Sequence, residues 1–162
     1  MKVHRRYFAR KDLITKIHSD LSAISEEYEK LIQDQFKVEV LEVNYETRFI
    51  LINGSLLIFK TTHGFFPTVR GALLLDNKRR FVTVDTGAIP FITNGADIMR
   101  PGIVNYDPKL NVGEYVVIIE EKYGKALAIG QTLCSGPELS SKKNGKCVKN
   151  IHYVGDELWC LG

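Results

Sequence analysis

The residues best placed for chemistry lie in the segment TNGADIMRPG, residues 93–102. Gly95 and Gly102 permit positive φ and the close approach of another backbone, and the N–H groups of their neighbours could face an anion. Arg100 adds a guanidinium suited to a two-pronged phosphate contact. The alternative is that both glycines only make tight turns and that Arg100 pairs with an acidic neighbour. We predict an anion-binding loop made of Asn94, Gly95, Ala96, Asp97, Arg100, Pro101 and Gly102.

Two basic clusters could support such a loop. Lysine and arginine side chains bind nucleic-acid phosphates whatever the base sequence, although charge runs are often only solvated loops. The net charge of +3 and the pI of about 8.7 favour a nucleic-acid partner only weakly, so the clustering matters more than the total. The cluster residues that we predict as phosphate contacts are Lys78, Arg79, Arg80, Lys142, Lys143 and Lys146.

The sequence contains no catalytic constellation. It lacks glycine-rich nucleotide-binding, metalloprotease and nucleophile-elbow motifs, and its histidines have no paired spacing. We expect Asp85 to cap a helix at 86–91 and Asp97 to bond the backbone of its own turn. Glu120 and Glu121 are adjacent in a strand and point to opposite faces, so they form no acid–base pair. We therefore expect no enzymatic activity and no cofactor.

The cysteines Cys134, Cys147 and Cys160 are spaced thirteen residues apart. With His152 as a fourth ligand they could form a zinc site, but zinc ligands usually occur in pairs two to four residues apart. The odd number of cysteines and the lack of a C-x-x-C motif argue against a disulfide framework. We expect buried, reduced thiols that pack as small apolar side chains, and no metal.

The bulk composition describes a globular chain. Its 162 residues are 44% hydrophobic and 25% charged, which allows one ordinary domain or two small ones. No apolar run approaches the roughly 18 residues of a membrane helix, and the basic N-terminus lacks the apolar region of a secretory signal. We therefore expect a cytoplasmic protein without a membrane segment.

Residues 10–34 have the periodicity of a helix. Ser25, followed by two glutamates, could cap a second helix, so one long helix and two short ones both fit. The apolar residues that recur at steps of three and four are Leu13, Ile17, Leu21, Ile24, Tyr28 and Leu31.

The pattern changes to strands after Gln35. Strands are predicted at 38–44, 48–53 and 55–61, and Asn53-Gly54 should form a type I′ turn between the last two. The following segment, 65–70, contains Pro67 and should be an edge. Its aromatic residues Phe65 and Phe66 would either stack on bases or, more simply, pack at a domain interface.

The charged segment 76–80 separates this half from one that is nearly all strand and turn. We place the boundary here, with an N-terminal α+β domain at 1–77 and a mostly-β domain at 78–162. Ile92, Met99 and Trp159 are expected in its core. Short strands with regular turn signals indicate a small barrel or sandwich. The predicted strands are 81–85, 114–121, 125–133, 150–154 and 157–161, with a short helix within 86–95 and one helical turn within 136–146.

The segment VDTGAIPFITNGADIMRPGIV, residues 84–104, resembles the opening of the PUA domain, the module named for pseudouridine synthases and archaeosine transglycosylases. The resemblance lies in Asp85, the Gly-Ala at the helix start and GADIMRPGI at 95–103. It extends to the family of the malignant T-cell amplified sequence protein and its archaeal relatives through residues 52–70 and 150–159. It covers most of the chain, although residues 1–35 match only in being helical.

The resemblance implies an α+β chain with a C-terminal PUA pseudo-barrel that binds structured RNA and carries no catalytic residues. Eukaryotic relatives of this type act on the small ribosomal subunit with a partner that supplies an initiation-factor-like domain. We therefore expect an RNA-binding protein of translation that acts at that subunit in initiation, reinitiation or recycling. Its partners would be rRNA or tRNA and an initiation-factor-like protein, and the chain itself would be monomeric.

Two other functions remain open at this point. The chain could be the substrate-recognition accessory subunit of an RNA-modifying complex that acts on tRNA or rRNA. It could also be a protein-interaction adaptor whose barrel has lost affinity for RNA. Co-sedimentation with small-subunit particles, with free tRNA or a modifying enzyme, or with protein alone would separate the three.

Overall fold

The structure, a computed structural model that describes residues 1–45 and 47–162, divides over that range into two units. The first unit comprises Met1–Asp76 together with Cys160–Gly162, and the second comprises Asn77–Trp159. The sequence analysis placed the boundary one residue later and did not anticipate that residues 160–162 return to the first unit. The independence of the two predicted domains stays a prediction.

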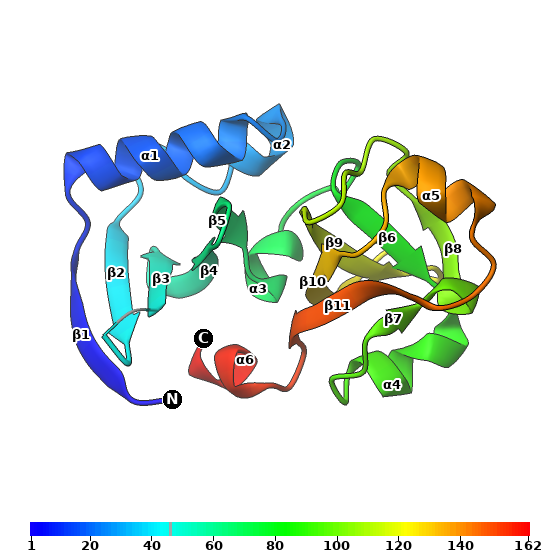
Figure 1. The fold of residues 1–162 in the computed structure, drawn as a ribbon. Coiled ribbons are helices and arrows are strands. Elements are labelled where there is room, and N and C mark those ends of the chain that lie inside the picture. The colour runs from blue at the N-terminus through cyan, green and yellow to red at the C-terminus, as the bar shows by residue number, and fades with distance from the viewer. Residues whose placement is uncertain (46) are drawn as a thin grey trace. The chain divides into compact units, whose positions relative to one another are not determined.

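The first unit is built on an antiparallel sheet with the strand order β1-β2-β3-β4-β5 (Figure 1). The predicted turn at Asn53-Gly54 is confirmed, because both residues have positive φ, 50° and 88°. The segment with Pro67 forms the edge strand β5, as expected. The strands are β1 Val3–Phe8, β2 Val38–Val43, β3 Thr47–Ile52, β4 Ser55–Thr61 and β5 Gly64–Pro67.

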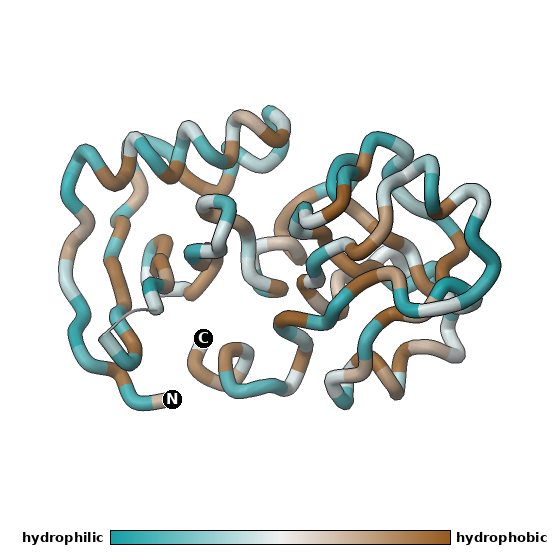
Figure 2. The backbone as a smooth tube through the Cα atoms, viewed as in Figure 1, coloured by the Kyte–Doolittle hydropathy of each residue, from teal (hydrophilic) through white to brown (hydrophobic). Residues whose placement is uncertain are grey.

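The helical segment consists of α1, Lys11–Ser22, and a separate α2, Glu26–Glu29. The Ser25 hydroxyl accepts a hydrogen bond from the backbone N–H of Tyr28 at 3.3 Å, so the chain restarts a helix where a cap was expected. Figure 2 shows hydrophobic residues recurring between hydrophilic ones along α1. Ile17, Leu21 and Tyr28 are fully buried, which confirms the predicted apolar face.

Two segments of the first unit differ from the sequence prediction. Residues 3–8, which carried no predicted strand, form β1 and pair with β2. Val69 and Arg70 belong to a short helix, α3 Val69–Ala72, because the Thr68 hydroxyl accepts the N–H of Gly71 and caps it. Phe65 and Phe66 are buried within this unit, where the Phe66 ring lies 5.6 Å from that of Tyr28.

Strand β1 is held to β2 by ion pairs between exposed arginines and buried glutamates. Arg5 donates from Nε and Nη2 to the Glu42 carboxylate at 2.9 and 3.3 Å, and Arg6 donates in the same way to Glu39 at 2.9 and 3.0 Å. Each glutamate is only 6% exposed. Hydrogen bonds from the arginines lower the pKa of both carboxyls below the ordinary value of 4.5. The basic N-terminus is therefore part of the sheet and not a free tail.

The sheet of the second unit has the order β7-β11-β10-β9-β6-β8. Its edge strands β7 and β8 are consecutive in the chain and are joined by η2, Arg100–Gly102, so the sheet must curl until it is nearly closed. The chain is thus a mixed α+β fold with a barrel-like sheet. The strands are β6 Phe81–Val84, β7 Ile98–Met99, β8 Ile103–Tyr106, β9 Tyr115–Glu120, β10 Ala126–Thr132 and β11 Lys146–Tyr153. The helices are η1 Thr86–Ala88, α4 Ile89–Ile92, η2 and α5 Gly136–Ser141. A last helix, α6 Glu157–Leu161, begins in this unit, and its final two residues belong to the first unit. Along the described residues, none of the helices combines the length and apolar character that crossing a membrane requires.

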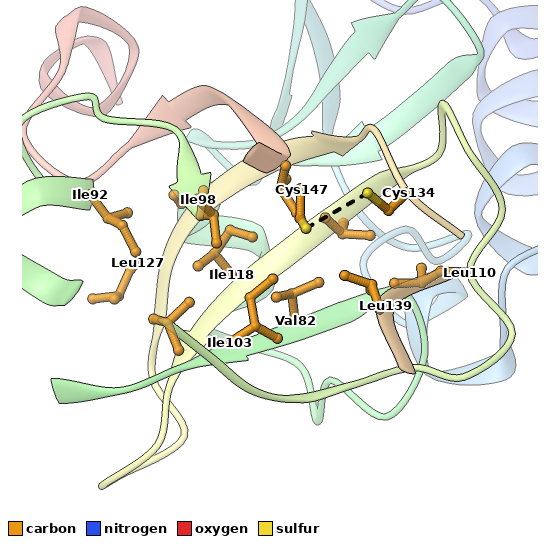
Figure 3. Packing of buried hydrophobic residues seen from close by; sticks show 14 residues of the cluster. Val82, Ile92, Ile98, Ile103, Leu110, Ile118, Leu127, Cys134, Leu139 and Cys147 are labelled. Atoms are coloured by element: carbon orange, nitrogen blue, oxygen red, sulfur yellow. Dashed lines mark hydrogen bonds between the residues drawn. The ribbon is translucent and has the colours of Figure 1, made fainter. Parts of the chain in front are cut away.

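The core of the second unit lies inside the curled sheet (Figure 3). Ile92 is 2% exposed, as predicted. Cys134 and Cys147 are buried there with their Sγ atoms 3.6 Å apart. Burial raises the pKa of the Cys147 thiol to about 11, so it is protonated at neutral pH. The expectation of buried thiols is confirmed for these two and wrong for Cys160, which is exposed in α6.

The last predicted strand, 157–161, is a helix. The Asp156 carboxylate accepts the N–H of Trp159 at 2.8 Å and that of Tyr153 at 2.9 Å, which starts α6 directly after β11. Burial raises the pKa of Asp156, but hydrogen bonds from His152 and from these N–H groups outweigh it and lower the pKa. Trp159 is consequently half-buried in α6 and does not close the barrel core.

The ion pairs of β1 predict a pH-dependent stability. Replacing both Arg5 and Arg6 with Ala leaves two buried carboxylates without their arginine partners, so the melting temperature should fall at pH 7. The lowered pKa of each glutamate stabilises the fold above pH 4.5 and ceases to do so as the carboxyls become protonated below it. The difference in melting temperature between wild type and variant should therefore shrink below pH 4.5.

The matched control is Arg10→Ala, because the Arg10 side chain is 88% exposed. It should melt with the wild type at every pH. A double variant that melts at the wild-type temperature at pH 7 would contradict the assignment of β1 to the sheet.

Candidate functional site

A cleft of about 380 Å³ opens in the second unit beside α4. We call it the α4 cleft. Its lining comes from 85–92 and 96–102, namely Asp85, Gly87, Ala88, Phe91, Ile92, Ala96, Asp97, Ile98, Met99, Pro101 and Gly102. Phe91 is 69% exposed and Met99 is 48% exposed. The expectation of Met99 in the core is therefore wrong, and the cleft has an apolar rim that faces solvent.

Local hydrogen bonds shape this cleft. The Asp85 carboxylate accepts the N–H of Ala88 at 2.9 Å, which confirms the predicted helix cap. Gly95 has φ +91°, and a Cβ there would lie 3.1 Å from the ring of Tyr153, so glycine is required for this turn. Gly102 has no positive φ, and a Cβ would meet Ala88 at an ordinary 3.6 Å. Residue 95 thus requires a glycine, as predicted, whereas residue 102 does not.

The backbone of the predicted loop is already hydrogen-bonded within the chain. The N–H groups of Asn94 and Ala96 both donate to the carbonyl of Phe91, and that of Gly95 donates to Ile92. The N–H of Arg100 donates to Gly145 at 2.8 Å. These bonds compete with the expected contact of the N–H groups with a phosphate, which stays a prediction.

The Arg100 side chain makes contacts inside the fold. Its Nε donates to the carbonyl of Leu139 and its Nη1 to that of Ile103, each at 2.9 Å, and the guanidinium lies 5.8 Å from the centre of the Tyr106 ring. Both sequence readings, a phosphate contact and an acidic partner, missed these carbonyls. Arg100 ties α5 to β8 at the point where the sheet closes, and its contact with a ligand stays a prediction.

The structure brings Lys146 and Lys149 of the cluster at 142–149 to Asp97, which lines this cleft. Lys146 pairs with Met99 in the β11–β7 register, and its Nζ lies 2.8 Å from the Asp97 carboxylate. Asp97 also accepts the N–H of Asn150 at 2.8 Å and so bonds to β11 instead of its own turn. The hydrogen bond from Lys146 is the main cause of the lowered pKa of Asp97. Lys149 also acts on the charge of Asp97. Lys143 is exposed in the loop before β11, whereas the Nζ of Lys142 lies 3.5 Å from the Sγ of Cys134.

The cluster at 78–80 does not join the cleft. Arg79 donates to the Asp107 carboxylate at 3.1 Å, and Arg80 lies 2.7 Å from that of Glu114. Both arginines precede β6, whereas Asp85 follows it, so roughly 16 Å of extended strand separates them from the cleft. Their role as phosphate contacts stays a prediction, and these ion pairs compete with it.

Sequence reasoning missed Phe91 as a rim residue, although a signal was present. Three of the four residues of α4 are large and apolar: Ile89, Phe91 and Ile92. A short helix on a surface buries one face, so these side chains cannot all enter the core. Figure 3 shows Ile92 in the buried cluster, next to Leu127.

Comparisons with known proteins identify a matching family model, related sequences and a similar structure. A family model described as the PUA domain matches residues 80–154. The chain is 32% identical over 130 residues to translation machinery-associated protein 20 of Schizosaccharomyces pombe, covering 76% of this chain and 72% of that protein. It is 34% identical over 130 residues to malignant T-cell-amplified sequence 1 of Rattus norvegicus, covering 75% and 69%. It resembles the crystal structure of a hypothetical protein of Pyrococcus horikoshii with a TM-score of 0.89 and 36% identity, covering 97% and 99%.

The contacts of Arg100 predict a loss of stability on substitution. Arg100→Ala removes the donor from the carbonyls of Leu139 and Ile103, which should cost about 1–3 kcal/mol in the free energy of unfolding measured with urea. Arg100→Lys should recover little of it, because an ammonium on a flexible stem lacks the rigid fork that reaches both carbonyls. Lys143→Ala, at an exposed position, serves as the control. Equal stability of Arg100→Ala and wild type would refute the structural role.

Proposed function

Because the chain belongs to the PUA-domain family of malignant T-cell-amplified sequence 1 and translation machinery-associated protein 20, we propose that it is an RNA-binding protein of translation. The observation that carries the proposal is the α4 cleft. It lies within the matched PUA region and places exposed apolar side chains beside a lysine-rich loop. That combination suits an unpaired RNA segment better than it suits a small molecule or a smooth duplex.

The chemistry of the rim supports this ligand. The Phe91 ring offers an exposed face on which a base can stack. Asp97, which would repel a phosphate, is balanced by Lys146 at 2.8 Å. The exposed lysines Lys143 and Lys149 then leave an excess of positive charge on the adjoining loop and strand, which raises the local concentration of RNA.

The same geometry supports a binding role without catalysis. The two carboxylates of the cleft both bind backbone N–H groups. Asp85 caps a helix by accepting the N–H of Ala88, and Asp97 accepts the N–H of Asn150 in β11. Neither is held in a pair suited to acid–base chemistry. We propose that the protein binds RNA without turning it over.

The site of action belongs to the same proposal. We place the protein on the small ribosomal subunit, in the cytoplasm, with an α+β domain at residues 1–77 that is followed in the chain by a PUA domain at 78–162. The names of the yeast and rat relatives and the match at 80–154 support this layout and role. An initiation-factor-like partner would act alongside the first domain.

RNA binding should respond separately to the ring and to the charges. Phe91→Ala should weaken binding to small-subunit RNA by about 1–3 kcal/mol without changing its salt dependence, since stacking carries no counterion term. Replacing Lys143 and Lys149 with Ala should reduce the slope of log affinity against log salt by about 1.4–1.8, taking about 0.7–0.9 per phosphate contact. Fluorescence anisotropy across a salt series measures both.

The control removes the same charge elsewhere, with Lys11→Ala and Lys60→Ala in the first unit. If the Phe91 and lysine variants bind as the wild type does, the cleft is not the RNA site. Co-sedimentation with purified small subunits tests the site of action. Association with free tRNA would instead favour an accessory subunit of an RNA-modifying complex. Association with protein alone would favour an adaptor.

A further inference from the structure

We propose that the turn between β9 and β10, residues 121–125, is a second RNA contact that stacks one unpaired base of a single strand bound in the α4 cleft. This inference rests on the proposed function and adds a site to it. The turn has the sequence Glu-Lys-Tyr-Gly-Lys. Tyr123 is 73% exposed, and the Nζ of Lys122 lies 5.2 Å from the centre of its ring.

A buried carboxylate fixes this turn. Glu120 is 5% exposed and accepts the backbone N–H of Lys122 at 2.8 Å, of Tyr123 at 2.9 Å and of Lys125 at 2.9 Å. Gly124 has φ +68°, which completes the reversal of the chain. The hydrogen bonds to Glu120 thus fix the backbone of the turn, and its conformation does not depend on the tyrosine ring. An aromatic side chain on a pre-ordered turn loses less conformational entropy on binding than one on a mobile loop.

The turn lies next to the α4 cleft. The N–H of Glu121 donates to the carbonyl of Val84 at 3.1 Å, and the Glu121 carboxylate accepts the N–H of Thr86 at 3.3 Å. Thr86 begins η1, whose Gly87 and Ala88 line the cleft. Tyr123 is two residues from Glu121, so its Cα lies at most about 7 Å along the chain from this junction. A single strand that leaves the cleft past η1 therefore meets the ring of Tyr123.

The charges around the ring favour a nucleic acid as its occupant. Lys122 and Lys125 flank Tyr123 in the sequence, and both are exposed. An aromatic face with neighbouring ammonium groups matches a base that is attached to a phosphate on either side. A hydrophobic partner would leave these ammonium groups desolvated and unpaired, which is costly.

The test measures the affinity of the full chain for a fluorescein-labelled, 12-nucleotide single-stranded RNA of mixed sequence. Tyr123→Ala should weaken binding about tenfold, which corresponds to about 1.4 kcal/mol. Tyr123→Trp should bind at least as well as wild type, because the indole keeps the stacking face. Both variants should have the melting temperature of the wild type, since the ring is exposed and the turn is held by Glu120.

The matched control is Val112→Ala, which trims an exposed apolar side chain in the loop that precedes β9. It should leave the affinity unchanged. If Phe91→Ala weakens binding while the affinity of Tyr123→Ala stays within twofold of wild type, the α4 cleft remains the proposed RNA site and the turn is not a contact. Equal losses in Tyr123→Ala and Tyr123→Trp would also overturn the stacking role. A wild type that does not bind this RNA overturns the inference, whereas the proposed function is then judged separately by binding to small subunits.

Discussion

The second unit depends on one constraint: β7 and β8, the two edges of its sheet, are joined by η2, Arg100–Gly102. A connection this short brings the edges together and leaves the sheet nearly closed. Arg100 secures the junction through the carbonyls of Leu139 and Ile103, and the carbonyl of Gly102 accepts the N–H of Asp85. The last bond fixes the start of η1 against η2. The α4 cleft is the space left between them, so its shape follows from the closure of the sheet.

Paired charges decide which part of the surface can attract RNA. Several basic residues that stand out in the sequence neutralise acidic groups in the fold: Arg5 with Glu42, Arg79 with Asp107 and Lys146 with Asp97. A count of basic residues therefore overstates the positive electrostatic potential at the protein surface. The more informative features are exposed lysines beside exposed aromatic or apolar side chains, as at the α4 cleft and at the turn with Tyr123.

Sequence reasoning succeeded where the signal was local. The Asn53-Gly54 turn, the Ser25 cap and the Asp85 cap are each determined by residues within three positions, and all three are present. It failed where a distant partner decides the structure. Strand β1 needs the carboxylates of β2, and the direction of Arg100 depends on carbonyls of α5 and β8. The fold class could thus be predicted from the sequence. Which hydrogen-bond donors of the site are already used within the fold could not.

The return of Cys160–Gly162 to the first unit has a consequence for synthesis of the chain. A Cβ at Gly162 would lie 3.4 Å from Leu56, so this segment covers a surface made far earlier. About eighty residues separate it from Asp76, and at roughly 5–20 residues per second a ribosome needs roughly 4–16 s to add them. Throughout that interval the nascent first unit is a complete sheet that lacks its final cover. Vectorial folding therefore proceeds through a stage in which the N-terminal half is made but residues 160–162, which belong to the same unit, are not.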